Sequence, residues 1–277
     1  MSALRPVGLR CRVGEPPRAT RGVEPLSVAL AERLGCTARL VGSSVEAARQ
    51  PWSVDLAEAQ GCLLECGGQL EDALAAGQVP LLIGGDCGIA LGTLPVLHRL
   101  RPAARVLWLD AHGDFHTPAS TSSGWLGGMA LAGACGAWDT GLGEAMAAEQ
   151  MVLCGVRSLD AGEGERLQAF GATVIGDSLE TLVYLQNALD GESVYVHLDP
   201  DVIDPEVMEA EHPAPGGLSV EKLYDLLDAV ADSCPIVGME VASFFCPDDP
   251  RRREGAVGVL VRALEPLLQA QETADAH

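Results

Sequence analysis

The stretch LWLDAHGDFH, at residues 107–116, joins an apolar run to four chargeable side chains, Asp110, His112, Asp114 and His116. The apolar residues predict a buried β-strand that leaves its sheet near Asp110. Side chains two residues apart in an extended segment point to the same side, so these groups converge where the strand ends. Like charges held together repel one another unless a cation lies between them. The stretch therefore predicts a strand that ends at a charged site.

Similar apolar runs alternate with longer helical patterns along the whole chain. The predicted strands cover residues 79–85, 104–112, 151–156, 172–176, 193–199 and 235–241, and the predicted helices cover residues 24–35, 54–76, 88–100, 162–170, 178–190, 219–232 and 255–270. Near-continuous apolar strands in β–α alternation are typical of a mainly parallel sheet with helices on both faces. We therefore expect an α/β fold. The length of 277 residues without a low-complexity linker predicts a single domain over residues 1–277.

The formal net charge of −21 comes from 39 acidic and 18 basic residues. An acidic surface disfavours nucleic acid and anionic membranes as partners, and it suits a small cationic substrate or a metal ion. The N-terminus has no apolar core of a signal peptide, and no apolar run reaches the roughly 18 residues of a membrane span. The nine cysteines are odd in number and show no CxxC spacing. This pattern predicts mostly buried thiols in a reducing, cytoplasmic compartment.

Three polar motifs lie at predicted strand ends, where ligands of parallel α/β folds bind: GGDC (84–87), DAHGD (110–114) and DPDVIDP (199–205). Asp199 and Asp201 again share one face. Together with the groups at 110, 112 and 114 they offer four carboxylates and one imidazole, a donor set that suits Mn²⁺. Two ions about 3.5–4 Å apart would explain this excess of charge. The alternative is that these aspartates only cap loops, although buried unpaired carboxylates are costly.

The three motifs, followed by PAPGGLS (213–219), resemble the ureohydrolase family of arginase, agmatinase and relatives between about residues 80 and 245. The resemblance implies the three-layer arginase-type α/β fold and two Mn²⁺ ions per chain. It assigns as metal ligands Asp110, His112, Asp114, Asp199 and Asp201. It also implies that a metal-bridging hydroxide attacks a guanidine carbon and that Asp114 helps to hold the resulting intermediate. Assemblies vary within the family, which leaves a homo-oligomer open.

Two segments match the arginase contacts to the amino-acid end of the substrate. The positions that correspond to the α-carboxylate contacts are His116, Thr121 and Ser123, with histidine in place of the usual asparagine. In VRSLDAGE (156–163) the α-amino contacts correspond to Asp160 and Glu163. The alternative for this second pair is a helix N-terminal cap. A retained clamp of this kind predicts a guanidino amino acid as substrate.

The reactive end departs from the arginase pattern at four positions. Cys87 replaces a ligand histidine, Gly127 replaces a histidine that is thought to shuttle protons, and His212 replaces a threonine. Ser243 falls on the guanidinium-binding glutamate when VGMEVASFF is aligned on its glycine, and an alternative alignment gives that place to Glu240. Cys87 is interpreted as a metal ligand, or alternatively as an unligated thiol that weakens metal binding.

These changes predict an altered guanidine head on an arginine-like amino acid. Losing a carboxylate disfavours a strongly basic guanidinium, whereas a hydroxyguanidine is less basic and can bind neutral, with Ser243 and His212 as partners of its N–OH. The combination resembles family members that convert Nω-hydroxy-L-arginine to hydroxyurea and L-ornithine in D-cycloserine biosynthesis. The alternatives are an L-arginase, another guanidino-acid hydrolase, or a metal-poor pseudoenzyme. His197 is interpreted as a structural strand-end residue, although strict alternation would let it contribute a ligand.

Overall fold

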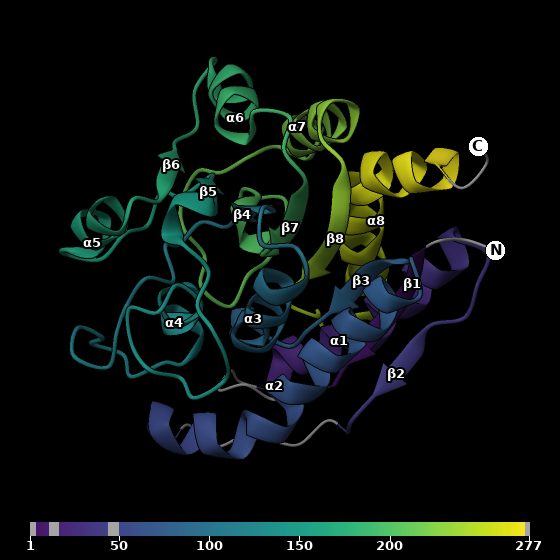
Figure 1. Ribbon diagram of the computed structural model, residues 1–277. Coiled ribbons are helices and arrows are strands. Elements are labelled where there is room, and N and C mark those ends of the chain that lie inside the picture. The colour runs from purple at the N-terminus through teal and green to yellow at the C-terminus, as the bar shows by residue number, and fades with distance from the viewer. Residues whose placement is uncertain (1–3, 11–16, 44–49, 275–277) are drawn as a thin grey trace.

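The computed structural model describes residues 4–10, 17–43 and 50–274 (Figure 1). Its strands are β1 (Leu4–Leu9), β2 (Arg39–Val41), β3 (Val79–Ile83), β4 (Arg105–Leu109), β5 (Met151–Cys154), β6 (Thr173–Ile175), β7 (Val194–Leu198) and β8 (Ile236–Val241). They form one eight-stranded sheet in the order β2-β1-β3-β8-β7-β4-β5-β6. Every recorded pairing is parallel. This sheet confirms the predicted α/β fold with a mainly parallel sheet.

Helices cover both faces of the sheet. The α-helices are α1 (Pro17–Arg33), α2 (Trp52–Ala75), α3 (Ala90–Leu100), α4 (Ala130–Ala134), α5 (Glu163–Phe170), α6 (Thr181–Leu189), α7 (Val220–Ser233) and α8 (Pro250–Ala274). Short 3-10 turns are η1 (Cys87–Ile89), η2 (Gly127–Met129), η3 (Ala148–Gln150) and η4 (Pro200–Val202). Buried side chains form one core under α1, α6, α7 and α8, and a second under α2, α3 and α4. Figure 1 shows the sheet between these two helical layers.

The strand sequences explain the two cores through their alternation. In β4, Leu107 and Leu109 belong to the first core, whereas Val106 and Trp108 belong to the second. Successive side chains of a strand point to opposite faces, so an apolar strand supplies both cores at once. The last residue of such a strand therefore fixes the direction in which the following polar residues point.

Two strands and one short helix were not predicted from the sequence. The strand β1 contains Pro6 and Gly8, which weaken a strand pattern, and β2 has only three residues. Pro6 lies just before the segment that pairs with β2, which begins at Val7. A Cβ atom on Gly8 would lie 2.5 Å from Ser27 Oγ, so glycine lets α1 approach the sheet closely. The helix α4 is a five-residue segment of small residues and leaves little periodic signal.

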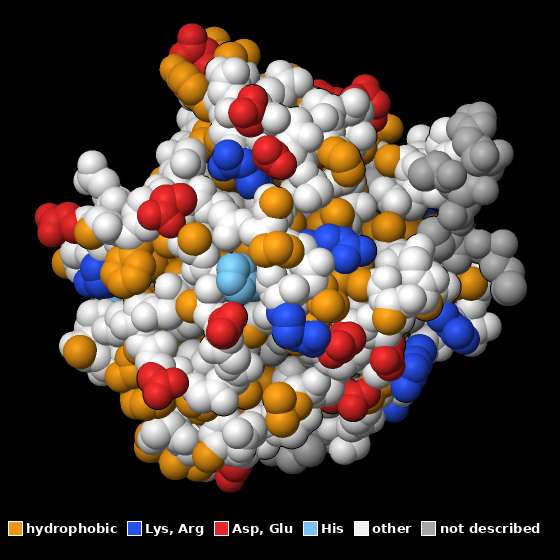
Figure 2. Space-filling view, viewed as in Figure 1, with side chains coloured by type: hydrophobic (Ala, Val, Ile, Leu, Met, Phe, Trp, Pro, Cys, Tyr) orange, Lys and Arg blue, Asp and Glu red, His pale blue; other side chains and the backbone are white. Residues whose placement is uncertain are grey.

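Cysteine usage agrees with the expectation only in part. Among the described residues seven cysteines are free, and all of these except Cys36 are buried. Cys62, by contrast, is disulfide-bonded, which departs from the predicted pattern of mostly buried thiols in a reducing compartment. Within the described ranges, no helix is both long and apolar enough to cross a bilayer. On the face drawn in Figure 2, basic side chains of described residues stand singly or beside acidic ones rather than in an extended patch.

Candidate metal centre and substrate cavity

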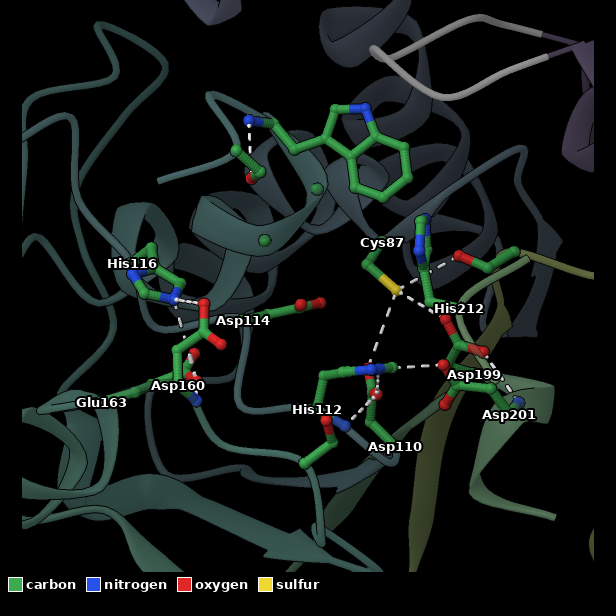
Figure 3. A pocket seen from close by; sticks show the side chains of 16 residues that line it. Cys87, Asp110, His112, Asp114, His116, Asp160, Glu163, Asp199, Asp201 and His212 are labelled. Atoms are coloured by element: carbon green, nitrogen blue, oxygen red, sulfur yellow. Dashed lines mark hydrogen bonds and ion pairs between the residues drawn. The ribbon is translucent and has the colours of Figure 1, made fainter. Parts of the chain in front are cut away.

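A cavity of about 240 Å³ opens where the segments after β3, β8, β7 and β4 meet. These four strands are consecutive neighbours in the sheet, so their carboxyl ends face one space. Predicted site residues that line the cavity are Cys87, Asp110, His112, Asp114, His116, Ser123, Asp160, Glu163, Asp199, Asp201, His212 and Ser243. In Figure 3, His116, Asp160 and Glu163 lie at one end, the labelled groups around Asp110 lie at the other, and Asp114 lies between them.

The cavity contains two overlapping groups of side chains that can hold a metal ion. Within each group the ligand atoms lie within 4.8 Å of one another, and the groups are Asp110, His112, Asp201 and Cys87, Asp110, His197. His112 Nδ1 is 2.9 Å from Asp201 Oδ2 and 3.4 Å from Asp110 Oδ1. A carboxylate common to both groups suits two ions that share one bridging ligand. The residues present therefore fit a binuclear metal centre.

Backbone amides hold three of the four candidate carboxylate ligands in place. Asp110 Oδ1 accepts the His112 N–H at 2.6 Å, Asp199 Oδ1 accepts the Asp201 N–H at 2.9 Å, and Asp201 Oδ1 accepts the Ala111 N–H at 2.9 Å. Each bond anchors one oxygen of a carboxylate. The second oxygen of each group is then presented in a fixed direction, which is the preorganisation that a metal site needs.

Cys87 lies directly against this centre. Asp86 begins η1 and its side chain accepts the Gly88 N–H at 2.7 Å, which fixes the turn that carries the thiol. Cys87 Sγ is 3.2 Å from Asp199 Oδ2, 3.8 Å from Asp110 Oδ2 and 3.4 Å from Ser243 Oγ. Cys87 therefore contacts the other candidate ligands, as predicted. That its sulfur binds a metal ion stays a prediction.

Burial and charge repulsion make the metal-free centre electrostatically unfavourable. Burial, together with the neighbouring Asp201, raises the pKa of Asp110 to about 6, and burial raises the pKa of Asp199 well above its usual range. Burial opposes protonation of His112, but Asp110 and Asp201 outweigh it and raise its pKa to about 12. The buried Cys87 thiol beside three aspartates has its pKa raised well above 9. Divalent cations would relieve this repulsion by taking the place of the protons.

The amino-acid end of the cavity is organised around His116. Its Nε2 lies 3.1 Å from Asp160 Oδ2, and its Nδ1 lies 3.2 Å from Arg166 Nη2. A guanidinium can only donate, so Nδ1 accepts this bond and Nε2 carries the proton that is directed at Asp160. Arg166 had not been identified from the sequence, because it lies half-way along a polar helix with no motif around it. Its contact sets which nitrogen of His116 is the donor.

The alternative that Asp160 is the helix N-cap with Glu163 three residues on is wrong, because Gly162 is the N-cap of α5 and Glu163 is its first residue. Glu163 Oε2 accepts the Asp160 N–H at 3.0 Å and Oε1 accepts the Phe115 N–H at 2.9 Å. The Asp160 side chain makes no such cap, since the first helical residue of α5 follows Gly162. Glu163 therefore ties the two cavity loops together, whereas the carboxylate of Asp160 lines the cavity and contacts His116.

Only part of the loop TSSG (121–124) lines the cavity. Ser123 lines the cavity, but Thr121 is not among the lining residues and instead accepts the Gly124 N–H at 3.0 Å. Gly127 is also part of the wall, so no side chain approaches from that position. The ring of His212 packs edge-on against Trp125, with centroids 3.9 Å apart. His212 is therefore held by an aromatic contact in the wall of the same cavity.

Ser243 and Glu240, the two candidates for the position of the guanidinium-binding glutamate, lie in different places. Ser243 lines the cavity, in a left-handed backbone conformation with φ of 53°. Glu240 is fully buried and absent from the cavity lining, and its Oε1 lies 2.6 Å from His197 Nδ1. The contact between Glu240 and His197 was not foreseen, because the sequence does not say that β7 and β8 are neighbours.

Known proteins resemble this chain in sequence and in fold. The sequence model of the arginase family matches residues 28–263. The chain is 35% identical over 242 residues to the Nω-hydroxy-L-arginine amidinohydrolase of Streptomyces lavendulae, covering 87% of this chain and 88% of that protein. It is 31% identical to the arginase of Bacillus caldovelox over 208 residues, 69% of each. A crystal structure of Bacillus subtilis arginase superposes with a TM-score of 0.84 at 25% identity, covering 97% and 98% of the two chains. The chain therefore belongs to the arginase family and is a hydrolase of C–N bonds in linear amidines.

Proposed function

We propose that this protein hydrolyses Nω-hydroxy-L-arginine to hydroxyurea and L-ornithine with two Mn²⁺ ions. The observation that carries the proposal is the composition of the reactive end of the cavity. There, Ser243 Oγ faces Cys87 Sγ at 3.4 Å. Every carboxylate among the described lining residues is either a candidate metal ligand or belongs to the clamp at the opposite end. A charged guanidinium would find no free carboxylate partner, whereas a neutral hydroxyguanidine needs only polar ones.

The relatives support the same substrate class. The protein named for hydrolysis of Nω-hydroxy-L-arginine aligns over 87% of this chain, and the arginase of Bacillus caldovelox aligns over 69%. The clamp residues His116, Ser123 and Asp160 would receive the amino-acid end that both substrates share. The biosynthetic setting implied by the resemblance, D-cycloserine biosynthesis, stays a prediction.

The chain's own residues have defined tasks in this reaction. The bound ions would supply an activated water and stabilise charge at the guanidine carbon. Water adds to that carbon, the bond from carbon to the δ nitrogen breaks, and the nitrogen leaves as the ornithine amine after taking up a proton. Asp114 lines the cavity between the two ends and is the proposed carrier of that proton. Ser243 and His212 would orient the N–OH group.

The proposal is tested by incubating the Mn²⁺-loaded protein separately with Nω-hydroxy-L-arginine and L-arginine and measuring ornithine. We expect kcat/KM to favour the hydroxylated substrate by about 10–100-fold, because the buried guanidinium of arginine would lack a carboxylate partner, at a cost of about 1–3 kcal/mol, whereas the neutral hydroxyguanidine needs none. Equal or better hydrolysis of arginine would assign the chain to the L-arginases. No hydrolysis of either substrate, with a metal content near zero, would instead support a pseudoenzyme.

Replacing Ser243 with glycine tests the head-group contact. Glycine adopts a positive φ without strain, so the backbone at this position should be retained. Loss of one neutral hydrogen bond to the N–OH group should lower kcat/KM for Nω-hydroxy-L-arginine by about 10-fold. Thermal unfolding serves as the control and should show no loss of stability. Unchanged kinetics with the hydroxylated substrate would contradict a role for Ser243.

A further inference from the structure

His197 occupies a polar position inside the second core. It is fully buried in β7 and pairs in register with Trp108 of β4 and with Glu240 of β8. Its ring stacks on the Trp108 indole with centroids 3.5 Å apart and an interplanar angle of 3°. Nδ1 lies 2.6 Å from Glu240 Oε1. Trp108 and Glu240, at the same level on the two neighbouring strands, therefore fix both the plane and the rotation of the imidazole.

Glu240 is itself held as an acceptor. Its Oε2 accepts the Tyr195 hydroxyl at 2.7 Å and the Thr93 hydroxyl at 2.8 Å. Both hydroxyls donate to this one oxygen, which leaves Oε1 for His197. With hydroxyl donors on Oε2, the carboxylate accepts the Nδ1 proton of His197 on Oε1. The lone pair of His197 is consequently on Nε2.

That Nε2 atom has no hydrogen-bond partner among the described residues. A buried polar atom without a partner costs about 1–3 kcal/mol. A ring nitrogen of His197, Cys87 Sγ and a carboxylate oxygen of Asp110 lie within 4.8 Å of one another. Because Nδ1 is engaged by Glu240, Nε2 is the nitrogen left for a cation. An imidazole whose other nitrogen donates to a carboxylate is the usual arrangement of a metal-binding histidine. One cation between these three atoms would satisfy the nitrogen lone pair, the sulfur and the carboxylate together.

We propose that His197 Nε2 is a ligand of the metal ion at Cys87 and Asp110, and that Glu240 is the positioning residue that orients it. This ion would then have nitrogen and sulfur donors, whereas the ion at His112 and Asp201 would have one nitrogen and otherwise oxygen donors. The inference rests on the metal centre and is independent of which guanidino compound is the substrate. The competing explanation is a metal-free contact in which the Cys87 thiol donates to His197.

The direct test uses chain labelled with ¹⁵N-histidine, loaded with Mn²⁺ alone and examined by pulsed electron paramagnetic resonance. Coordinated imidazole nitrogen gives a hyperfine modulation that needs no substrate and no turnover. In the His112→Gln variant, the half-exposed imidazole of the other group is removed while His197 is untouched. We expect the ¹⁵N modulation to persist in His112→Gln. Two results would overturn the proposal. One is loss of the ¹⁵N modulation in a sample that still binds Mn²⁺ at the Cys87 group, and the other is a variant that binds no Mn²⁺ at that group.

Metal titration of two further variants provides an independent readout. Glu240→Gln removes the charge behind the imidazole and should weaken one of the two Mn²⁺ affinities by about 10–100-fold. His197→Gln should weaken the same affinity at least as much. His98→Gln, on α3 and outside the cavity lining, is the matched control and should bind both ions as the unmodified chain does. Unchanged affinities in Glu240→Gln and His197→Gln would assign His197 to the core alone, whatever the substrate tests give.

Discussion

Replacing Asp114 with asparagine is expected to lower kcat by about 10³-fold, since about 4 kcal/mol of transition-state stabilisation and the proton carrier would be lost. The substitution is unusually clean in structural terms. Asp114 has φ of 48°, and asparagine is one of the few residues that tolerate this left-handed conformation. Ornithine release from Nω-hydroxy-L-arginine is the measurement. Because the backbone should be retained, the loss would report on chemistry rather than on folding.

A matched control for this variant is Asp190→Asn. Asp190 is exposed at the end of α6, is not among the residues that line the cavity, and has φ of 51°. Both variants make the same chemical change in the same backbone conformation. Asp190→Asn should keep the activity of the unmodified chain. Rates close to normal in Asp114→Asn would remove Asp114 from the proposed mechanism.

Removing the metal ions is expected to abolish turnover and to destabilise the fold. An ion that binds only the folded chain adds about 2.7 kcal/mol at 100 times its Kd. For a chain of this size that gain corresponds to a rise in Tm of about 5–10 °C. The physical reason is the buried group of Asp110, Asp199 and Asp201, whose repulsion the cations relieve. Calorimetry of chelated and Mn²⁺-loaded protein would measure the shift.

Re-addition of different ions is the control for the chelation experiment. Mn²⁺ should restore both Tm and turnover, whereas Mg²⁺ should restore little, because it prefers an octahedral shell of oxygen ligands and the centre includes Cys87 and His112. Turnover that persists in chelated protein shown by elemental analysis to carry no metal would contradict a metal-dependent mechanism.

Sequence reasoning succeeded where the signal was local. The alternation in residues 107–116 placed three candidate ligands on one side of a strand end, and the cavity contains all three. The clusters at 110–114 and 199–201 lie together, as expected for neighbouring parallel strands. The strands β1 and β2 were missed because their stability is not local. Pro6 and Gly8 interrupt the strand pattern of β1, which is stabilised by its neighbouring strands and by α1.

The sequence by itself therefore determined the class of fold, the strand ends that carry the chemistry, and the kind of ions they suit. Period-two alternation and chain order are local properties, readable without coordinates. Only the tertiary structure decided which strands are neighbours, and this order brings Cys87 within 3.2 Å of Asp199 Oδ2 and places Glu240 behind His197. Lateral strand order depends on how distant helices pack on both faces of the sheet. No short stretch of sequence contains that information, because the packing energy belongs to contacts between segments far apart in the chain.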